Sequence, residues 1–205
     1  VVSSGYLARF KDLEVRVVLL DELAARPDPP NKDCVVDSES RMLREARDEI
    51  ISGGLAGGYA YIDKHPHPRL WKLLAHKALE DLELDTAERS FVRYQDYYGV
   101  QLVKQLRGMS DKMKARAEVA VFMGKYDEAE SIYREIDRKD LAIAFRKRVG
   151  DHMRVVQLLQ TGGGNDRLVR DAWDRIGQYY TDRFKWRKAL QYFQLSRNME
   201  RLAEC

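Results

Sequence analysis

Residues 71–91 read WKLLAHKALEDLELDTAERSF, a stretch in which the small residues Ala75 and Ala87 stand twelve positions apart. The same step of twelve recurs in the pairs Ala117–Ala129 and Gly177–Ala189. A bulky residue stands four positions before the first member of each pair (Trp71, Met113, Trp173), and an aromatic residue four positions after the second (Phe91, Tyr133, Phe193). This arrangement matches the signature of tetratricopeptide-like repeats and predicts a helical hairpin at each of the three places.

The physical basis of the signature is close packing of two antiparallel helices. Small side chains at facing positions let the helices approach, and the aromatic side chains fill the grooves beside them. The steps from Ala87 to Ala129 and from Ala129 to Ala189 are 42 and 60 residues, so the hairpins do not form a regular tandem array. We therefore predict an all-α fold, an irregular tetratricopeptide-like α-solenoid of stacked antiparallel helical hairpins. Solenoids of this kind usually act as binding scaffolds.

Composition supports this class and argues against two others. The 205 residues are 44% hydrophobic and 34% charged, which suits a thin solenoid with much solvated surface. The net charge is only +3, without a basic motif lined by aromatic residues, so nucleic acid is not an expected partner. The longest apolar run, Val17–Leu20, is far too short to cross a membrane, and no transmembrane segment is expected.

The cysteines indicate the redox compartment of the chain, and the first residues indicate whether it is part of a longer protein. Cys34 and Cys205 lie far apart without a C-x-x-C partner, which argues against a disulfide framework or a zinc finger and fits a reducing compartment. Residues 1–5 have neither an initiator Met nor the layout of a signal peptide. The expectation from these residues is a piece of a longer protein.

The chain ahead of the repeats is expected to be helical as well. Residues 11–25 have an apolar stripe of helical period, which the proline-rich stretch 26–31 ends. A second helix is expected over about 37–51, a break at Gly53–Gly58 and a short segment at 59–64. No strand alternation is recognised, so no sheet is expected. We divide the chain into a helical lead-in segment, 1–67, and a tetratricopeptide-like solenoid, 68–205, that stops within a repeat.

Within the solenoid, Pro68 suits the first turn of a helix. The predicted helices are 69–81 with 84–95, a single helix at 97–107, 112–123 with 127–136, 139–149 with 151–160, and 166–181 with 185–196. The pair at 139–160 has lost the small-residue signature, although Gly150 marks its turn. The closing residues 198–205 predict the opening turns of another helix.

No residue pattern predicts chemistry. Gly162–Gly164 follows a predicted helix and lacks the Gly-Lys-Ser/Thr of a phosphate loop, so it is interpreted as a linker. The four histidines do not have metal-ligand spacing on one helix face (His65, His67, His76, His152). In the acidic run 80–85, Asp85 is expected to cap a helix. No serine or cysteine has the setting of an activated nucleophile. We expect no catalytic, cofactor-binding or metal-binding residues, and we predict a non-enzyme.

Two further features have an ordinary structural interpretation. The dipeptide Trp173-Asp174 lies in a helical register and not in a propeller blade. The basic clusters Arg146–Arg148 and Arg183–Lys188 are interpreted as solvated helix faces; contact with an acidic partner or anionic lipid is the alternative.

Specific strings give a closer resemblance. The chain resembles the WD-repeat protein 35 family of intraflagellar transport complex A subunits over most of its length, most weakly over 35–60. The most distinctive strings are HPHPRLW at 65–71 and RLAEC at 201–205; others are RFKDLEVR at 9–16, DLAI at 140–143 and QLL at 157–159.

The resemblance implies an architecture of two N-terminal β-propellers followed by a long helical solenoid, as in coat proteins, with this chain beginning just after the propellers. It implies a non-catalytic scaffold in retrograde transport along ciliary microtubules, cilium assembly and movement of membrane proteins into cilia. The implied partners are other complex A subunits, neighbouring complexes in transport trains and ciliary membrane cargo adaptors. The implied locations are the cilium or flagellum, the basal body and the cytoskeleton-associated cytoplasm. The nearest alternative is a sibling complex A subunit with the same layout. A coatomer-type vesicle coat subunit, a free-standing peptide-binding adaptor and an enzyme with a helical accessory domain are more distant alternatives.

Overall fold

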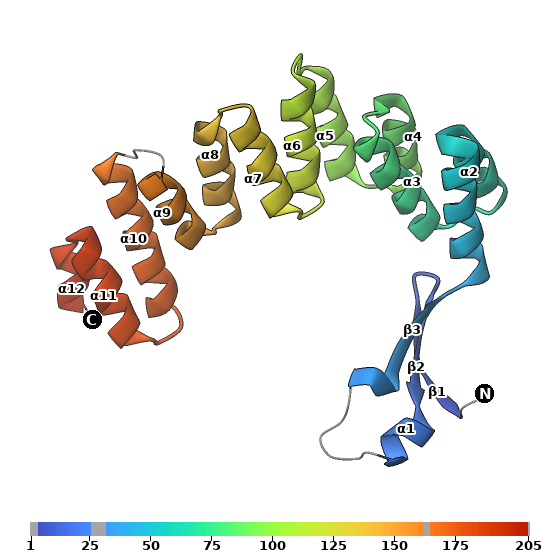
Figure 1. Ribbon diagram of the computed structural model, residues 1–205, viewed down its shortest axis with the longest axis horizontal. Helices are drawn as coiled ribbons and strands as arrows, with labels where there is room; N and C mark the ends of the chain where they lie inside the picture. The colour runs from blue at the N-terminus through green and yellow to red at the C-terminus, as the bar shows by residue number, and fades with distance from the viewer. Residues whose placement is uncertain (1–3, 26–31, 162–164, 205) are drawn as a thin grey trace. The chain divides into compact units, whose positions relative to one another are not determined.

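The computed structural model describes residues 4–25, 32–161 and 165–204, which divide into two compact units, 1–110 and 111–205. The first unit begins with a small sheet and continues with helices α2–α5, and the second contains α6–α12 (Figure 1). Within each unit the successive helices pack against their neighbours in sequence. This nearest-neighbour packing confirms the predicted all-α solenoid of hairpins as the main architecture.

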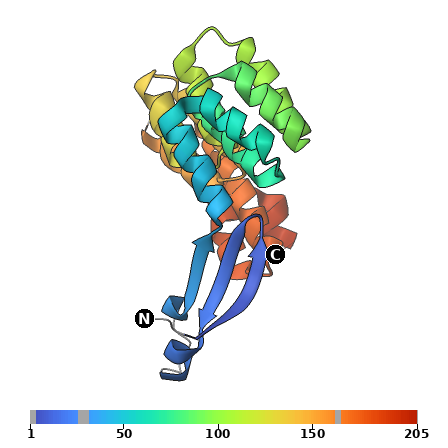
Figure 2. The ribbon, with the colours of Figure 1, turned by 90° about the vertical axis from the view of Figure 1, so that its right-hand side faces the viewer.

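The expectation of helix and no sheet at the start of the chain is wrong. Residues there form a three-stranded antiparallel sheet in the order β1 (Gly5–Lys11), β2 (Glu14–Leu19) and β3 (Val35–Glu39), whose strands lie side by side in Figure 2. A short helix, α1 (Leu20–Ala25), follows β2, and a 3₁₀ turn, Lys32–Cys34, precedes β3. The helical lead-in segment predicted for 1–67 is therefore incorrect over 5–19 and 35–39, and the predicted helix at 11–25 is reduced to α1. The proline-rich stretch 26–31 lies outside the described residues.

The turn between β1 and β2 explains the error. Asp12 and Leu13 both have positive φ, 56° and 62°, as a two-residue type I′ hairpin turn requires. Such a turn is normally recognised in a sequence by Asn-Gly or Asp-Gly. Here the second turn residue is Leu13, so the sequence does not indicate the turn. The backbone N–H of Ser40 donates to the carbonyl of Leu13 (2.8 Å), and the Leu13 side chain packs on the first helical core. Tertiary contact thus holds Leu13 in a backbone region that its side chain disfavours.

The element α2 (Arg41–Lys64) is a helical hairpin in itself. Its helix is interrupted at Gly54, where φ is 68° and ψ is −169°, so the predicted break in the glycine-rich stretch is confirmed. The two arms meet where a Cβ on Gly58 would overlap Cγ1 of Ile50, and the hydroxyl of Tyr61 donates to Glu45 (2.8 Å). The helix starts at Arg41 and not at residue 37, because the Ser40 side chain caps it after β3 ends.

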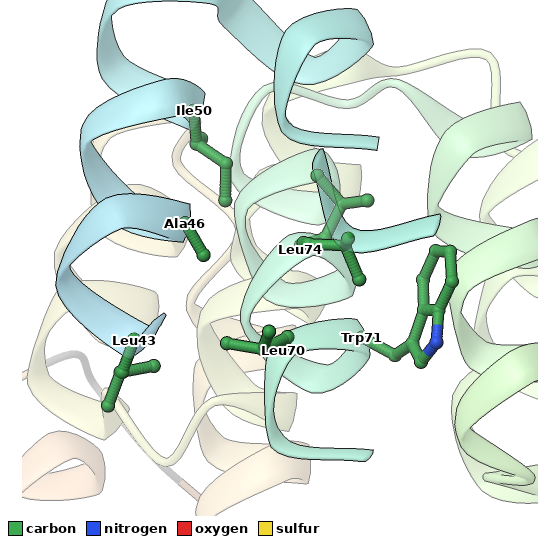
Figure 3. Packing of buried hydrophobic residues seen from close by; sticks show 7 residues of the cluster. Leu43, Ala46, Ile50, Leu70, Trp71 and Leu74 are labelled. Carbon is green, nitrogen blue, oxygen red and sulfur yellow. The ribbon is translucent and has the colours of Figure 1, made fainter. Parts of the chain in front are cut away.

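Ala46 and Gly58 repeat the twelve-residue step of the later hairpins, and Ile62 takes the position that Phe or Tyr fills elsewhere. All three residues are buried. The signature therefore extends to α2, where the glycine-rich sequence obscured it. Figure 3 shows how this hairpin meets the next one: Leu43, Ala46 and Ile50 lie along one arm of α2 and face Leu70 and Leu74 of α3.

The remaining helices of the first unit follow the prediction closely. They are α3 (Pro68–Glu80), α4 (Leu84–Tyr94) and α5 (Tyr97–Arg107). Pro68 is the first residue of α3, as expected, and His67 caps it by accepting the backbone N–H of Arg69 at Nδ1 (3.1 Å). Asp85 does not cap α4, because that helix begins one residue before it; its carboxylate instead accepts from Nη2 of Arg107 (2.6 Å).

The second unit contains the other predicted helices. They are α6 (Lys112–Phe122), α7 (Tyr126–Glu135), α8 (Lys139–Val149), α9 (His152–Thr161), α10 (Asp166–Thr181), α11 (Trp186–Ser196) and α12 (Met199–Glu204). The small residues predicted at the hairpin contacts of both units are all buried, which confirms the repeat signature (Ala75, Ala87, Ala117, Ala129, Gly177, Ala189). A Cβ on Gly177 would lie 2.6 Å from Cε1 of Phe193, so only glycine allows this approach of α10 and α11.

Most turns between helices close in one way. A residue in the left-handed region follows the helix, and the next residue's N–H donates to a carbonyl five positions back, as in the Schellman motif. The left-handed residues in these turns are Leu82, Gln95, Gly124, Asp137, Gly150, Phe184 and Arg197. Because only two of the seven are glycine, the motif was hard to recognise from the sequence.

Candidate functional site

The most organised polar site of the second unit is an ion network buried among α7, α8 and α9. Arg146 and Glu130 are each 4% exposed at the side chain, and Nη2 of Arg146 lies 2.8 Å from Oε2 of Glu130. Arg146 also pairs with Asp127 (2.6 Å) and Asp151 (3.2 Å). Arg154 binds the other side of Glu130, with Nη2 2.7 Å from Oε1. Three charged neighbours, Asp127, Asp151 and Arg154, thus surround two buried ions.

The charges in this network stabilise one another. Burial raises the pKa of Glu130, but hydrogen bonds from Arg154 and Arg146 outweigh it, so the net pKa lies below the ordinary value of 4.5. An ionised Glu130 accepts from both guanidinium groups and leaves neither buried charge without a partner. We infer that the network fixes the relative positions of three helices; a saturated set of ion pairs offers neither a free base nor a nucleophile.

The interpretation of Arg146–Arg148 as a solvated face is therefore wrong for Arg146. Its acidic partners come from the same chain. Arg148 also reaches back to the chain, with Nη2 3.3 Å from Glu118, whose other oxygen accepts from the hydroxyl of buried Tyr133 (2.7 Å). Burial and then Glu118 raise the pKa of Tyr133, so its hydroxyl stays a donor. Sequence reasoning missed this network. The available signal was the position of Glu130, which lies between Ala129 and Tyr133 and is buried with them.

The four histidines, among which no metal site was predicted, have separate structural settings. His65 contacts the ring of Tyr61 on α2, and His67 caps α3. Burial, then Lys72 and Arg69, lowers the pKa of His76, and burial, then Arg175 and Lys147, lowers that of His152. Across 4–25, 32–161 and 165–204 no group of three or more His, Cys, Asp or Glu has the geometry to hold a metal ion. The absence of catalytic, cofactor-binding and metal-binding residues from this chain stays a prediction.

The other residues singled out in the sequence have ordinary places. Trp173 packs in the core of α9 and α10, and Asp174 accepts from the amide of Asn198 (2.7 Å), which confirms that the dipeptide belongs to a helix. Cys34 is buried and free. Gly162–Gly164 and Cys205 lie outside the described residues. No helix in the described part of the chain is long and apolar enough to cross a bilayer.

The second basic cluster is solvent-exposed, as predicted. Residues 182–188, DRFKWRK, form the turn between α10 and α11 and the first turn of α11, and all seven are exposed. The aromatic rings of Phe184 and Trp186 lie edge to face within this cluster, with centroids 6.1 Å apart. Sequence reasoning noted the charges of this cluster but gave the two aromatic rings no role.

Comparison with known proteins gives matches along the whole chain. The family model described as the WDR35 second beta-propeller matches residues 1–39, which include the three strands, and the model of the IFT80/172/WDR35/WDR19 TPR domain matches residues 70–159. WD repeat-containing protein 35 of Rattus norvegicus is 46% identical over 99% of this chain, and that of Homo sapiens is 47% identical over 99%. The intraflagellar transport protein 122 homolog of Homo sapiens is 32% identical over 36% of the chain.

The coverage of the relatives is small. The chain spans 18% of the rat protein and 17% of the human one. The matched regions agree with the observed order of elements, a sheet followed by helical hairpins. The identity over nearly all of this chain, the two matched regions and their agreement with the fold together assign it: the chain belongs to the WD repeat-containing protein 35 family.

Proposed function

We propose that this chain is a non-catalytic scaffold region of an intraflagellar transport complex A subunit. In this role it supports retrograde transport along ciliary microtubules, cilium assembly and the movement of membrane proteins into cilia. The observation that carries the proposal is 46% identity to WD repeat-containing protein 35 over 99% of the chain. Similarity to an intraflagellar transport protein 122 homolog, named for the same transport process, supports it.

The architecture is physically suited to such a role. Each helix packs mainly on its neighbours in sequence, so successive hairpins present side chains to solvent along the whole array. The buried ions in α7–α9 are saturated by partners within the chain, which leaves binding to the exposed faces and turns. Binding distributed over many hairpins suits assembly with large partners better than capture of a small ligand.

The proposed partners are the other complex A subunits, with neighbouring complexes in transport trains and ciliary membrane cargo adaptors as further partners. The proposed location is the cilium, its basal body and the associated cytoplasm. The division of the chain near residue 67 into a lead-in segment and a solenoid also remains a proposal. We no longer propose that the chain begins just after the propellers, because residues 1–39, with β1–β3, match the model of a second β-propeller.

The test is affinity purification of the tagged full-length protein from ciliated cells, followed by quantitative mass spectrometry. The proposal expects complex A subunits as the most enriched proteins. A variant carrying Ala129→Arg, which disrupts the α6–α7 contact, should recover fewer of them, whereas Arg138→Met at an exposed pair should recover as many as the wild type. Enrichment of vesicle coat subunits, or of proteins bound through peptide tails without any complex A subunit, would contradict the proposal.

A further inference from the structure

The turn between α10 and α11 contains a residue that the turn itself does not favour. Phe184 occupies the left-handed position of the Schellman motif, with φ of 57°, and its side chain is 78% exposed. Glycine fills the same position at Gly124 and Gly150 without strain. Of the other residues at this position the apolar one, Leu82, is half-buried. A strained, exposed aromatic residue points to a role outside the fold.

The charge around Phe184 is concentrated and unbalanced. Residues 182–188, which we name the basic tip, contain four cations and one carboxylate, a formal charge of +3 that equals the net charge of the whole chain. Asp182 is engaged with the amide of Gln178 (2.8 Å). Among the residues that the structure describes, no carboxylate pairs with the four cations of the tip, which are Arg183, Lys185, Arg187 and Lys188.

The start of α11 adds to the same positive field. Lys185, in the N-cap position just before the helix, makes no side-chain capping hydrogen bond, and the first turn contains no acidic residue. The helices α4 and α7 also lack a side-chain cap, but they carry Asp85 and Asp127 in the first turn. Because the N-terminal end of a helix is itself partly positive, cations placed there raise the potential that an anionic group would meet.

Part of the basic tip is held in place. The guanidinium of Arg183 lies 3.5 Å from the centroid of the Tyr179 ring, and its Nη1 donates to the carbonyl of Tyr179 (3.2 Å). The ammonium of Lys188 lies 5.5 Å from the centroid of the Tyr180 ring. Fixed cations beside exposed aromatic rings favour a partner whose carboxylates have fixed positions too, which is a property of a protein segment and not of a fluid lipid surface.

We propose that the basic tip docks an acidic segment of a partner protein. Carboxylates of that segment pair with Arg183, Lys185, Arg187 and Lys188, and an apolar side chain of the segment covers Phe184 and Trp186. Removing the Phe184 ring from water then supplies binding energy that offsets the strain at this position. The proposal deepens the scaffold function proposed above, but its test does not depend on which complex the partner belongs to.

The test begins with a photo-crosslinking phenylalanine analogue at position 184 of the full-length protein in ciliated cells. The crosslinked peptide is identified by mass spectrometry and synthesised, and its affinity for the full-length protein is measured by fluorescence anisotropy. The same analogue at Leu82, the matching position of the α3–α4 turn, controls for nonspecific capture. The proposal expects a peptide of net negative charge at position 184 and a different result or none at position 82.

Three variants then separate binding from folding. Phe184→Gly should raise the melting temperature, because glycine suits the left-handed position, and weaken peptide binding at least tenfold. Arg197→Gly relieves the same kind of strain outside the tip and should leave the affinity unchanged. The pair Arg187→Glu and Lys188→Glu should weaken binding at least tenfold without lowering the melting temperature, because acidic residues suit the first turn of a helix. Crosslinks to lipid, to neutral or basic segments or to no molecule would overturn the proposal, as would equal affinities of wild type and Phe184→Gly.

Discussion

The guanidinium of Arg146 on α8 and the carboxylate of Glu130 on α7 meet at 2.8 Å in the interior of the second unit, where both side chains are almost inaccessible to solvent. Arg154 on α9 completes the contact from the other side of Glu130. The signature of small residues has decayed in the α8–α9 hairpin, and ion pairing links this hairpin to the one before it. This polar contact adds to the apolar packing between the same helices, where Ala129 and Tyr133 of α7 share a core with Ala142 and Phe145 of α8.

Loss of Arg146 should therefore be costly. Arg146→Met keeps most of the side-chain volume but leaves Glu130 with one cation, and we expect a loss of about 3 kcal/mol in the free energy of unfolding. Urea denaturation measures it. Arg138→Met is the matched control, because Arg138 pairs with Asp140 at the surface, and it should change little. Equal effects of the two variants would show that the buried network contributes no more than a surface pair.

The same network predicts a pH dependence. The pKa of Glu130 is lowered in the folded state, so its contribution to stability is present above the unfolded pKa and is lost as pH falls through the folded pKa. The stability difference between wild type and Glu130→Gln should be full at neutral pH and shrink as pH falls below the ordinary value of 4.5. Denaturation of both proteins over a pH series measures this, and a difference that grows toward low pH would contradict it.

Close approach of helices predicts opposite effects of one substitution at two glycines. Gly177→Ala forces the ring of Phe193 to move and should destabilise the protein by about 1–3 kcal/mol. Gly57→Ala meets only ordinary contacts, the nearest 3.5 Å away, and should stabilise it by about 0.5–1 kcal/mol. If Phe193→Leu does not recover part of the loss at position 177, the ring contact is not its cause.

Strain in the last turn predicts a stabilising substitution. Arg197 follows α11 in the left-handed region, with φ of 59°. Arg197→Gly should raise the free energy of unfolding by about 1 kcal/mol, because glycine has no Cβ to oppose this conformation. Thermal denaturation gives the sign, and Gly124→Ala, the reverse change at an equivalent turn, should be destabilising by a similar amount.

The hairpin contact of α6 and α7 should not tolerate a large charged residue. Ala129 is fully buried beside Ala117 and Tyr133. Ala129→Arg should cost about 3 kcal/mol or more, because it overpacks the contact and buries a charge without a partner. Thermal unfolding followed by circular dichroism should show lower cooperativity and a lower melting temperature. An unchanged unfolding transition would contradict the interpretation of the signature as close packing of helices.

Sequence alone predicted the helices from residue 68 onward closely. The step from Ala75 to Ala87 and its two repeats are local patterns, since hairpin geometry fixes how far apart two facing residues stand. Gly150 and Pro68 likewise marked a turn and a helix start through their own backbone preferences. The same step from Ala46 to Gly58 was present but unused, because glycine-rich sequence is normally a breaker and only packing against Ile50 shows that Gly58 belongs to a helix.

Tertiary structure decided the features that depend on partners distant in sequence. The turn at Asp12 and Leu13 forms because β2 pairs with β1 and Leu13 is held by the helical core, although its local preference is against that conformation. Arg146 is buried because Glu130 and Asp127 of another helix compensate its charge. Helical periodicity can be recognised from consecutive residues, whereas strand pairing and charge burial depend on which distant groups the fold brings together.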